Sequence, residues 1–329
     1  MNKHISTQVR RSFIFTPGLK PEMFSKALTS GTDMVCIELE DGIAPKDKEL
    51  ARKLAMKIFD SKQENDGVER ILRVNCLREQ FGIEDIQAIL KTSNPPPVLM
   101  LPKVKTAQEV VLLDDLLTEK EHKTRLHIII ETNEGLENAY QIANCSKRID
   151  ALFFGGVDMS AELRCENKWE PLLYARSRIV HAAASAGIDA IDVPYLDLKD
   201  PNGMKIEAQK AKELGFSGKG SIHPKQIPIL NEVFTPTDQE IEKAKKITST
   251  FENANTGLVV INGKLIEKPG LRAMYRILAI AESCHIYTSD AADDLSCVDL
   301  GALRIIKKKN SAIPNLTQQQ STNEDLETK

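Results

Sequence analysis

A mostly apolar run that ends abruptly in a carboxylate is the first feature of this sequence that could do chemistry. The stretch 126-LHIIIETNEG-135 has the pattern of a strand buried on both faces, and Glu131 follows its last apolar residue. A second apolar run, residues 149–154, continues as 154-FGGVDMS-160 and places Asp158 just beyond its end. Carboxylates that lie together repel each other unless they share a proton or a cation. Because Mg²⁺ uses one or two carboxylates with substrate oxygens and water, we predict that Glu131 and Asp158 bind Mg²⁺, with Mn²⁺ as the alternative metal.

Other apolar runs also end in polar side chains. Glu40 and Asp41 follow the run 34–39, Arg73 projects from 71-ILRVN-75, and Lys103 ends 98-VLMLPK-103. For Glu40 and Asp41 two interpretations stay open, which are support of the metal site and capping of the next helix. Lys103 raises the option of a Schiff-base aldolase, which the metal-binding pair disfavours.

Further polar residues lie at or just after the ends of the last two apolar runs. Asp192, near the end of the seventh run, and Tyr195, just after it, are expected at the same rim. His223, before Pro224, is expected to make a hydrogen bond that structures its loop. The six histidines show no ligand spacing for zinc, and no GxSxG motif is present.

The elements that must position these residues alternate regularly along the chain. Short apolar runs alternate with amphipathic stretches whose apolar residues recur at helical spacing. The apolar runs are residues 12–15, 34–39, 71–75, 98–103, 127–132, 149–154, 188–193 and 219–223. Eight such units predict an α/β protein with a (β/α)₈ TIM barrel, whose active site lies at the carboxyl ends of the strands. A doubly wound open sheet is the alternative, although no GxGxxG motif follows any run.

Four segments are expected along the chain. An N-terminal tail, 1–10, precedes the catalytic barrel, 11–235. A lid or oligomerisation extension, 236–285, has the pattern of a helix, a hairpin with an Asn262-Gly263 turn, and a second helix. A tail, 286–329, follows, and its polar end is expected to be disordered.

The composition excludes several functions. The net charge is −3, with 44 basic and 47 acidic residues interspersed, so nothing indicates nucleic-acid binding. No apolar run approaches the roughly 18 residues of a membrane span. The six cysteines form no CxxC pair, and we expect free thiols in a reducing compartment, the cytoplasm.

Eight stretches in register resemble the HpcH/HpaI aldolase and citrate lyase β-subunit family. Within it, the sequence is most similar to free-standing malyl-CoA, citramalyl-CoA or citryl-CoA lyases. The resemblance covers residues 10–284. The matching stretches are 11-RSFIFTPG-18, 38-ELEDGIAPKDKELAR-52, 72-LRVN-75, 101-LPKV-104, 130-IETNEG-135, 154-FGGVD-158, 219-KGSIHPKQI-227 and 261-INGKLIEKP-269.

The resemblance implies a Mg²⁺-dependent barrel, assembled as a homotrimer or homohexamer, with Glu131 and Asp158 as metal ligands. It assigns Arg73 to the carboxylate and carbonyl oxygen of a 2-oxo acid. It assigns CoA contacts to Phe15, Lys20 and Lys26; residue type alone would place the two lysines on the solvated surface. The implied reaction is retro-Claisen cleavage of a 3-hydroxyacyl-CoA thioester into acetyl-CoA, or a homologue, and a 2-oxo acid.

Two residues depart from the family pattern. Glu267 stands where the family carries an Asp that serves as acid and base in a neighbouring subunit's active site. Because its arm is one methylene longer, a non-catalytic or regulatory relative stays open as an alternative. A second alternative is an aldolase that acts on free 2-oxo acids and leaves the thioester site unused. Arg164 follows Leu163 where the family tends to have glycine, and we expect it to face solvent. The acyl group stays undetermined.

Overall fold

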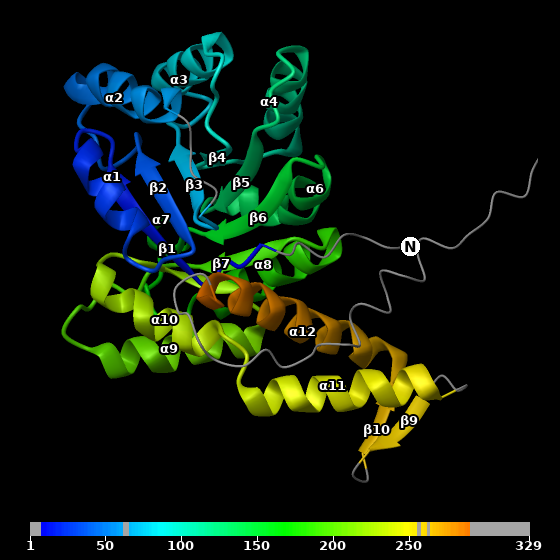
Figure 1. Cartoon of the computed structure of the whole chain (residues 1–329). Helices are drawn as coiled ribbons and strands as arrows, with labels where there is room; N and C mark the ends of the chain where they lie inside the picture. The colour runs from blue at the N-terminus through cyan, green and yellow to red at the C-terminus, as the bar shows by residue number, and fades with distance from the viewer. Residues whose placement is uncertain (1–7, 62–65, 255–257, 262–263, 290–329) are drawn as a thin grey trace, which may run out of the picture. The chain divides into compact units, whose positions relative to one another are not determined.

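Eight parallel strands form a closed barrel in which each strand pairs with the next along the chain and β8 pairs with β1 (Figure 1). The computed structural model describes residues 8–61, 66–254, 258–261 and 264–289. The strands are β1 (Ser12–Pro17), β2 (Met34–Glu38), β3 (Glu69–Arg73), β4 (Val98–Leu101), β5 (Arg125–Ile130), β6 (Ile149–Phe154), β7 (Asp189–Asp192) and β8 (Gly218–Ser221). The predicted TIM barrel is therefore confirmed, and the open sheet is excluded.

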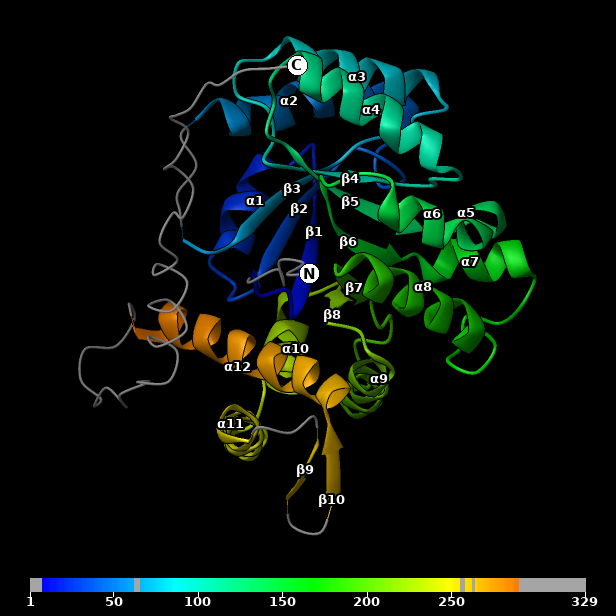
Figure 2. The same cartoon turned by 90° about the vertical axis from the view of Figure 1, so that its right-hand side faces the viewer.

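Helices follow the strands and surround the barrel (Figures 1 and 2). They are α1 (Pro21–Leu28), η1 (Pro45–Asp47), α2 (Lys48–Asp60), α3 (Gln80–Lys91), α4 (Ala107–Glu119), α5 (Asn133–Glu137), α6 (Ala139–Asn144), α7 (Gly156–Leu163), α8 (Leu173–Ala186), α9 (Pro201–Leu214), η2 (Pro224–Gln226) and α10 (Ile227–Phe234). Local sequence sets their ends, since Thr106 and Glu109 form a capping box before α4. Gly215 ends α9 in the left-handed conformation.

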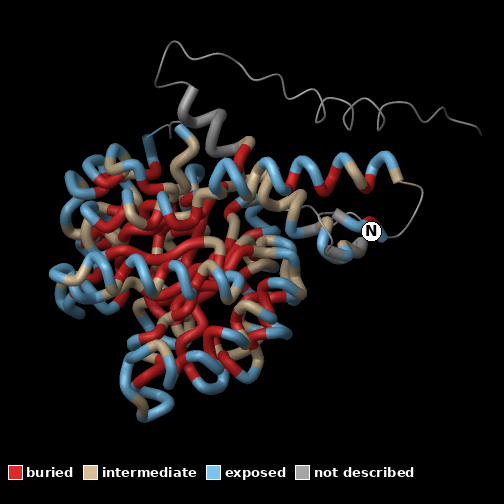
Figure 3. The backbone as a smooth tube through the Cα atoms, turned by 90° about the horizontal axis from the view of Figure 1, so that it is seen from below, coloured by how far each residue is buried: buried red, intermediate tan, exposed pale blue. Residues whose placement is uncertain are grey.

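Buried residues gather at the centre of the molecule (Figure 3), and they form two layers, separated by the barrel wall. Alternate strand residues face opposite sides of the wall, so Phe13 packs inside the barrel while Ile14 packs against the helices. The interior layer consists of Phe13, Met34, Cys36, Ile71, Val98, Met100, Ile129, Ala151, Phe153 and Ile191. This filled interior separates the two ends of the barrel.

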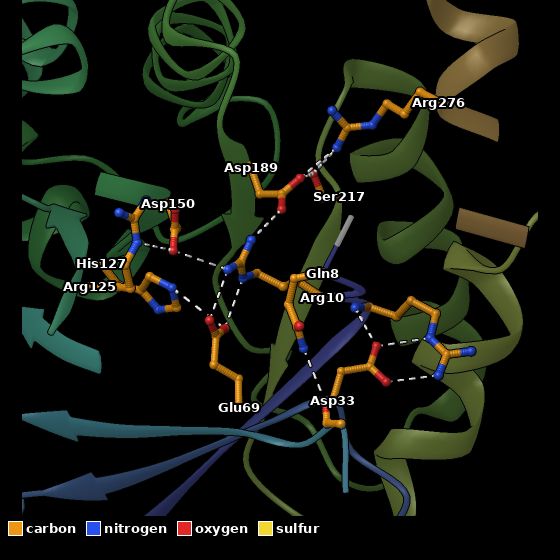
Figure 4. A network of polar contacts seen from close by, with 12 residues as sticks. Gln8, Arg10, Asp33, Glu69, Arg125, His127, Asp150, Asp189, Ser217 and Arg276 are labelled. Carbon is orange, nitrogen blue, oxygen red and sulfur yellow. Dashed lines mark hydrogen bonds and ion pairs between the residues drawn. The ribbon is translucent and has the colours of Figure 1, made fainter. Parts of the chain in front are cut away.

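A network of ion pairs closes the amino end of the barrel (Figure 4). Arg10 is only 4% exposed, although the sequence placed it in the N-terminal tail. Its guanidinium donates hydrogen bonds of 2.8 Å to Glu69 and Asp189 and lies 3.6 Å from Asp150. His127 is fully buried beside Glu69, and burial lowers its pKa to about 4, so it is neutral near pH 7. Breaking such buried pairs costs several kcal/mol, about 3–5, so this end is structural.

The C-terminal segment forms the predicted helix, hairpin and helix. These elements are α11 (Asp238–Asn253), the antiparallel strands β9 (Leu258–Ile261) and β10 (Lys264–Glu267), and α12 (Lys268–Ser289). The predicted turn at residues 262–263 and the chain beyond 289 lie outside the described residues. Phe251, Val259 and Ile266 form a small core that joins the hairpin to the helices. No helix in the described part of the chain combines the length and apolar composition that crossing a membrane requires.

One side chain fixes α12 to the barrel. Arg276 donates hydrogen bonds to Asp189, 2.7 Å away, and to Ser217, 2.6 Å away (Figure 4). Both partners lie at the amino ends of strands, Asp189 at the first residue of β7 and Ser217 just before β8. The extension therefore contacts the end of the barrel opposite to the carboxyl ends of the strands.

Candidate active site

Glu131 lies directly after β5, buried at the carboxyl end of the barrel. It is 3% exposed, and its Oε1 accepts a hydrogen bond of 2.8 Å from the backbone N–H of Lys103. Gly155, after β6, makes room for it, because a Cβ at position 155 would lie 2.3 Å from Oε2 of Glu131. Burial, followed by the negative charges of Asp158 and Glu40, raises the pKa of Glu131 to about 8. The charge of Arg73 opposes this rise but does not outweigh burial and the two neighbouring acids.

Asp158 lies in the first turn of α7, after the neighbouring strand β6, and is partly exposed. Its charge acts on Glu131, so the structure brings the two predicted metal ligands into one site. No group of three or more metal-ligating side chains occurs among the residues that the structure describes. Mg²⁺ commonly takes one or two protein carboxylates, and water and substrate oxygens fill its other coordination positions. Glu131 and Asp158 therefore fit this ion.

Arg73 ends β3 and forms the cationic part of the site. It pairs with Glu38, and its guanidinium lies 3.4 Å from Glu40. Burial alone would lower the pKa of Arg73, but the charges of these carboxylates outweigh it and raise the pKa. The guanidinium also lies over the ring of Phe15, 4.5 Å from its centroid. Phe15 thus supports Arg73 from within the barrel.

The two acids after β2 occupy different environments. Glu40 is buried and lies 2.5 Å from the ammonium of Lys103, whereas Asp41 is exposed and accepts from the same ammonium at 3.0 Å. Neither carboxylate caps the helix that follows, since the N-cap residues of η1 and α2 are Ala44 and Asp47. The geometry therefore favours the interpretation of Glu40 and Asp41 as support for the site.

Lys103 itself is held as a cation. Burial alone would lower the pKa of its ammonium, but the hydrogen bonds and charges of Glu40 and Asp41 prevail and raise it well above the ordinary value. A Schiff-base mechanism needs a neutral amine, which these two carboxylates oppose. The structure therefore argues against the aldolase route through Lys103.

Sequence reasoning gave no role to several buried side chains around the site. Glu38 was noted only as a strand end, yet it pairs with Arg73, and burial raises its pKa. Lys48 donates to the carbonyl groups of Leu39 and Glu40 and to Oδ1 of Asn75, at 2.5–2.8 Å. Amphipathic spacing marks a helical lysine as surface, so the sequence offered no signal for Lys48. For Glu38 the strand periodicity was the signal, because Cys36, two residues earlier, faces the interior.

Other predicted residues lie apart from this cluster. Lys20 and Lys26 are exposed on and before α1, and neither ammonium makes an ion pair within the described ranges. His223 accepts a hydrogen bond from the backbone of Lys225 through Nδ1, as expected for a loop-structuring residue. Arg164 is exposed at the end of α7, in line with the solvent-facing expectation.

Asp192 was expected at the rim, and this prediction was wrong. It faces the helices, where it accepts from Arg176 at 2.9 Å and from Lys219 at 2.6 Å. Its neighbour Ile191 faces the barrel interior, and strand alternation turns Asp192 outward.

Glu267 is not joined to the site of its own chain by any described contact. It ends β10 and pairs with Leu258 in the ladder, and its side chain lies outside the described residues. The helix that follows it is fixed through Arg276 to the amino end of the barrel. Glu131 lies at the other end.

Comparisons with known proteins place the chain in one family. Residues 11–224 match the family described as HpcH/HpaI aldolase/citrate lyase. The chain is 32% identical to citrate lyase subunit beta of Leuconostoc mesenteroides subsp. cremoris, over 86% of this chain and 97% of that protein. It is 30% identical to L-malyl-CoA/beta-methylmalyl-CoA lyase of Rhodobacter capsulatus, over 85% of this chain and 96% of that protein.

A solved structure shares the fold. The protein CitE of Mycobacterium tuberculosis, in complex with magnesium, acetoacetate and coenzyme A, is 25% identical, with a TM-score of 0.69. The match covers 84% of this chain and 99% of that one. The chain therefore belongs to the HpcH/HpaI aldolase/citrate lyase family of metal-dependent carbon–carbon lyases.

Proposed function

We propose that this protein cleaves a 3-hydroxyacyl-CoA thioester of the malyl, citramalyl or citryl type into acetyl-CoA, or a homologue, and a 2-oxo acid. The observation that carries the proposal is the pair Glu131 and Asp158 beside the buried guanidinium of Arg73. Two carboxylates that can hold a metal ion, next to a fixed arginine, suit a 2-oxo acid. The metal and the arginine would bind its carboxylate and its carbonyl oxygen. Mg²⁺ held by the two carboxylates would polarise that oxygen.

Arg73 would bind and orient the 2-oxo acid end of the substrate. Its fork of N–H donors matches a carboxylate, and Phe15 and Glu40 already fix the plane and position of the guanidinium. In the cleavage the 3-hydroxyl loses its proton and becomes the new carbonyl. The carbon–carbon bond breaks, and its electron pair passes to the thioester fragment as an enolate. Protonation of that enolate carbon gives acetyl-CoA or its homologue.

The CoA moiety would lie along the start of α1. Lys20 and Lys26 present exposed ammonium groups there, and neither is paired with a carboxylate in the described ranges. The phosphates of CoA carry the complementary charge. Phe15, in contrast, lies under Arg73, and its contribution would be to position that residue.

The proton would come from Glu267 of a second copy of the chain in a homotrimer or homohexamer. Two observations support this assembly. The extension is fixed to the amino end of its own barrel, away from its own Glu131. In the hairpin, Val260 and Leu265 pair with each other and are 65% and 59% exposed, a face that a neighbouring subunit could cover.

The test is a panel of malyl-, methylmalyl-, citramalyl- and citryl-CoA, incubated with the full chain and Mg²⁺. The expected result is release of a 2-oxo acid from at least one thioester, measured by coupled reduction of that acid, and none after chelation with EDTA. Cleavage of free hydroxy acids alone would indicate an aldolase instead. Binding of Mg²⁺ and a 2-oxo acid without any turnover would identify a regulatory relative and refute the proposal.

A further inference from the structure

Lys103 joins two parts of the site that no other described residue connects directly. Its backbone N–H donates to Glu131, at the metal end, and its side chain reaches the two acids after β2. Glu40, one of these acids, lies 3.4 Å from the guanidinium of Arg73. A single residue therefore contacts both the carboxylate that fits the metal and the carboxylate that holds the substrate arginine.

The backbone of Lys103 has an unusual conformation that this arrangement explains. Its φ is +53°, in the left-handed region, which residues with a Cβ avoid and glycine adopts readily. In this conformation the N–H points at Oε1 of Glu131, 2.8 Å away. Strained residues of this kind persist when the surrounding contacts hold them, and they occur most often at functional sites.

The side chain supplies those contacts. The ammonium lies 2.5 Å from Glu40 and 3.0 Å from Asp41, and both carboxylates belong to the loop after β2. Lys48 holds the same loop through hydrogen bonds from its ammonium to the carbonyl groups of Leu39 and Glu40. Because the loop is fixed at both points, the two ion pairs can hold Lys103 in its strained conformation.

We propose that Lys103 is a positioning residue with two separable roles. Its ion pairs keep the backbone in the left-handed conformation, and the backbone N–H then fixes Glu131 for metal binding. Its ammonium also shares the charge of Glu40, which leaves Arg73 available for the substrate carboxylate. The second role rests on the proposed function, whereas the first concerns metal binding alone.

Three substitutions separate the roles. Lys103→Gly removes the ammonium but adopts a positive φ without strain, so the N–H stays on Glu131. Lys103→Ala removes the ammonium and keeps the Cβ, so the backbone is free to leave the left-handed region and take the N–H with it. Lys103→Arg keeps a cation within reach of Glu40 and Asp41. Each full-length variant is checked for folding by circular dichroism.

The first measurement is Mn²⁺ binding, followed by electron paramagnetic resonance without substrate. The glycine variant is expected to bind Mn²⁺ within about threefold of the wild-type affinity, and the alanine variant about tenfold more weakly, the usual scale for groups that orient a metal ligand. Equal affinities for the glycine and alanine variants would overturn the backbone role. This result does not depend on which substrate the protein cleaves.

The second measurement is cleavage of the best thioester of the panel at saturating Mg²⁺. The glycine variant is expected to lose about tenfold or more in kcat/KM, mainly through a higher KM because Glu40 then competes for Arg73, and the arginine variant to recover most of it. Wild-type cleavage by the glycine variant would overturn the side-chain role. A wild-type protein that cleaves no thioester would refute the proposed function, while Mn²⁺ binding would still decide the backbone role.

Discussion

The buried carboxyl of Glu131 should give the metal-free protein a pH dependence that Glu131→Gln removes. Burial and the charges of Asp158 and Glu40 raise its pKa to about 8 in the folded chain, against an ordinary value of 4.5. Between these values the unfolded chain has released a proton that the folded chain keeps. The folded state therefore binds more protons, and its stability falls as the pH rises. Below about pH 4 the effect vanishes, because both states are protonated.

The magnitude follows from the width of that interval. Each unit of difference between the two pKa values corresponds to about 1.4 kcal/mol, and integration from about pH 5 to about pH 8 gives a loss of about 3.5 kcal/mol. Glutamine has nearly the same shape and carries no charge at any pH. Relative to the wild type, the variant should therefore gain about 3.5 kcal/mol over this interval.

The assay is urea unfolding of both full-length proteins in EDTA, at one protein concentration and at several pH values. The difference between the two free energies of unfolding at each pH cancels the contribution of titrating groups that lie far from Glu131. Glu242→Gln, at an exposed position on α11, is the control and should run parallel to the wild type. If Glu131→Gln also runs parallel to the wild type, the burial argument is refuted.

Metal binding should release the proton that the Glu131 carboxyl group keeps in the metal-free protein. At about pH 7 roughly nine-tenths of the Glu131 carboxyl groups in the metal-free protein are protonated, so Mg²⁺ must displace nearly one proton when it binds. Calorimetric titration in two buffers with different heats of ionisation measures this number. A value near zero would mean that Glu131 is already ionised in the metal-free protein, contrary to its raised pKa.

Three further substitutions test individual contacts. Arg73→Lys keeps the charge but loses the bidentate fork, so kcat/KM for the thioester should fall about 100-fold while Mn²⁺ affinity stays unchanged. Lys20→Glu should raise the KM for a CoA thioester about tenfold without changing kcat, and Lys243→Glu, on α11, should change neither. Gly155→Ala should weaken Mg²⁺ binding at least about tenfold, since its Cβ would lie 2.3 Å from an oxygen of Glu131.

The sequence predicted the barrel well because strand and helix periodicities differ and alternate eight times. It placed Glu131 and Asp158 together because the carboxyl ends of the strands share one face of the barrel, and their role as metal ligands stays a prediction. The prediction failed for Asp192 because the alternation of inward-facing and outward-facing strand residues was not applied to it. Glu38 received no role for the same reason. The contacts of Lys48 and Lys103 could not be predicted, since they depend on where loops far apart in the sequence meet.

The two ends of the barrel differ in the balance of their charges. Charged side chains gather at both ends, but acids and cations match in number only at the amino end. At the amino end three acids meet three arginines, namely Glu69, Asp150 and Asp189 with Arg10, Arg125 and Arg276. At the carboxyl end five acids gather around three cations, namely Glu38, Glu40, Asp41, Glu131 and Asp158 around Arg73, Lys48 and Lys103.

Burial is the main cause of the raised pKa of Glu131, and this excess of acids adds to it. A cluster of acids in a buried site can reduce its repulsion by taking up a proton or by binding a divalent cation. At the amino end Arg276 completes the balance and, in the same contact, ties α12 to the barrel. A charge reversal there would disturb assembly of the extension, whereas a charge reversal at the carboxyl end would change metal binding. The two ends of one barrel thus use the same residue types. The ratio of acids to arginines distinguishes the amino end, where ion pairs hold the structure together, from the carboxyl end, where we expect metal binding.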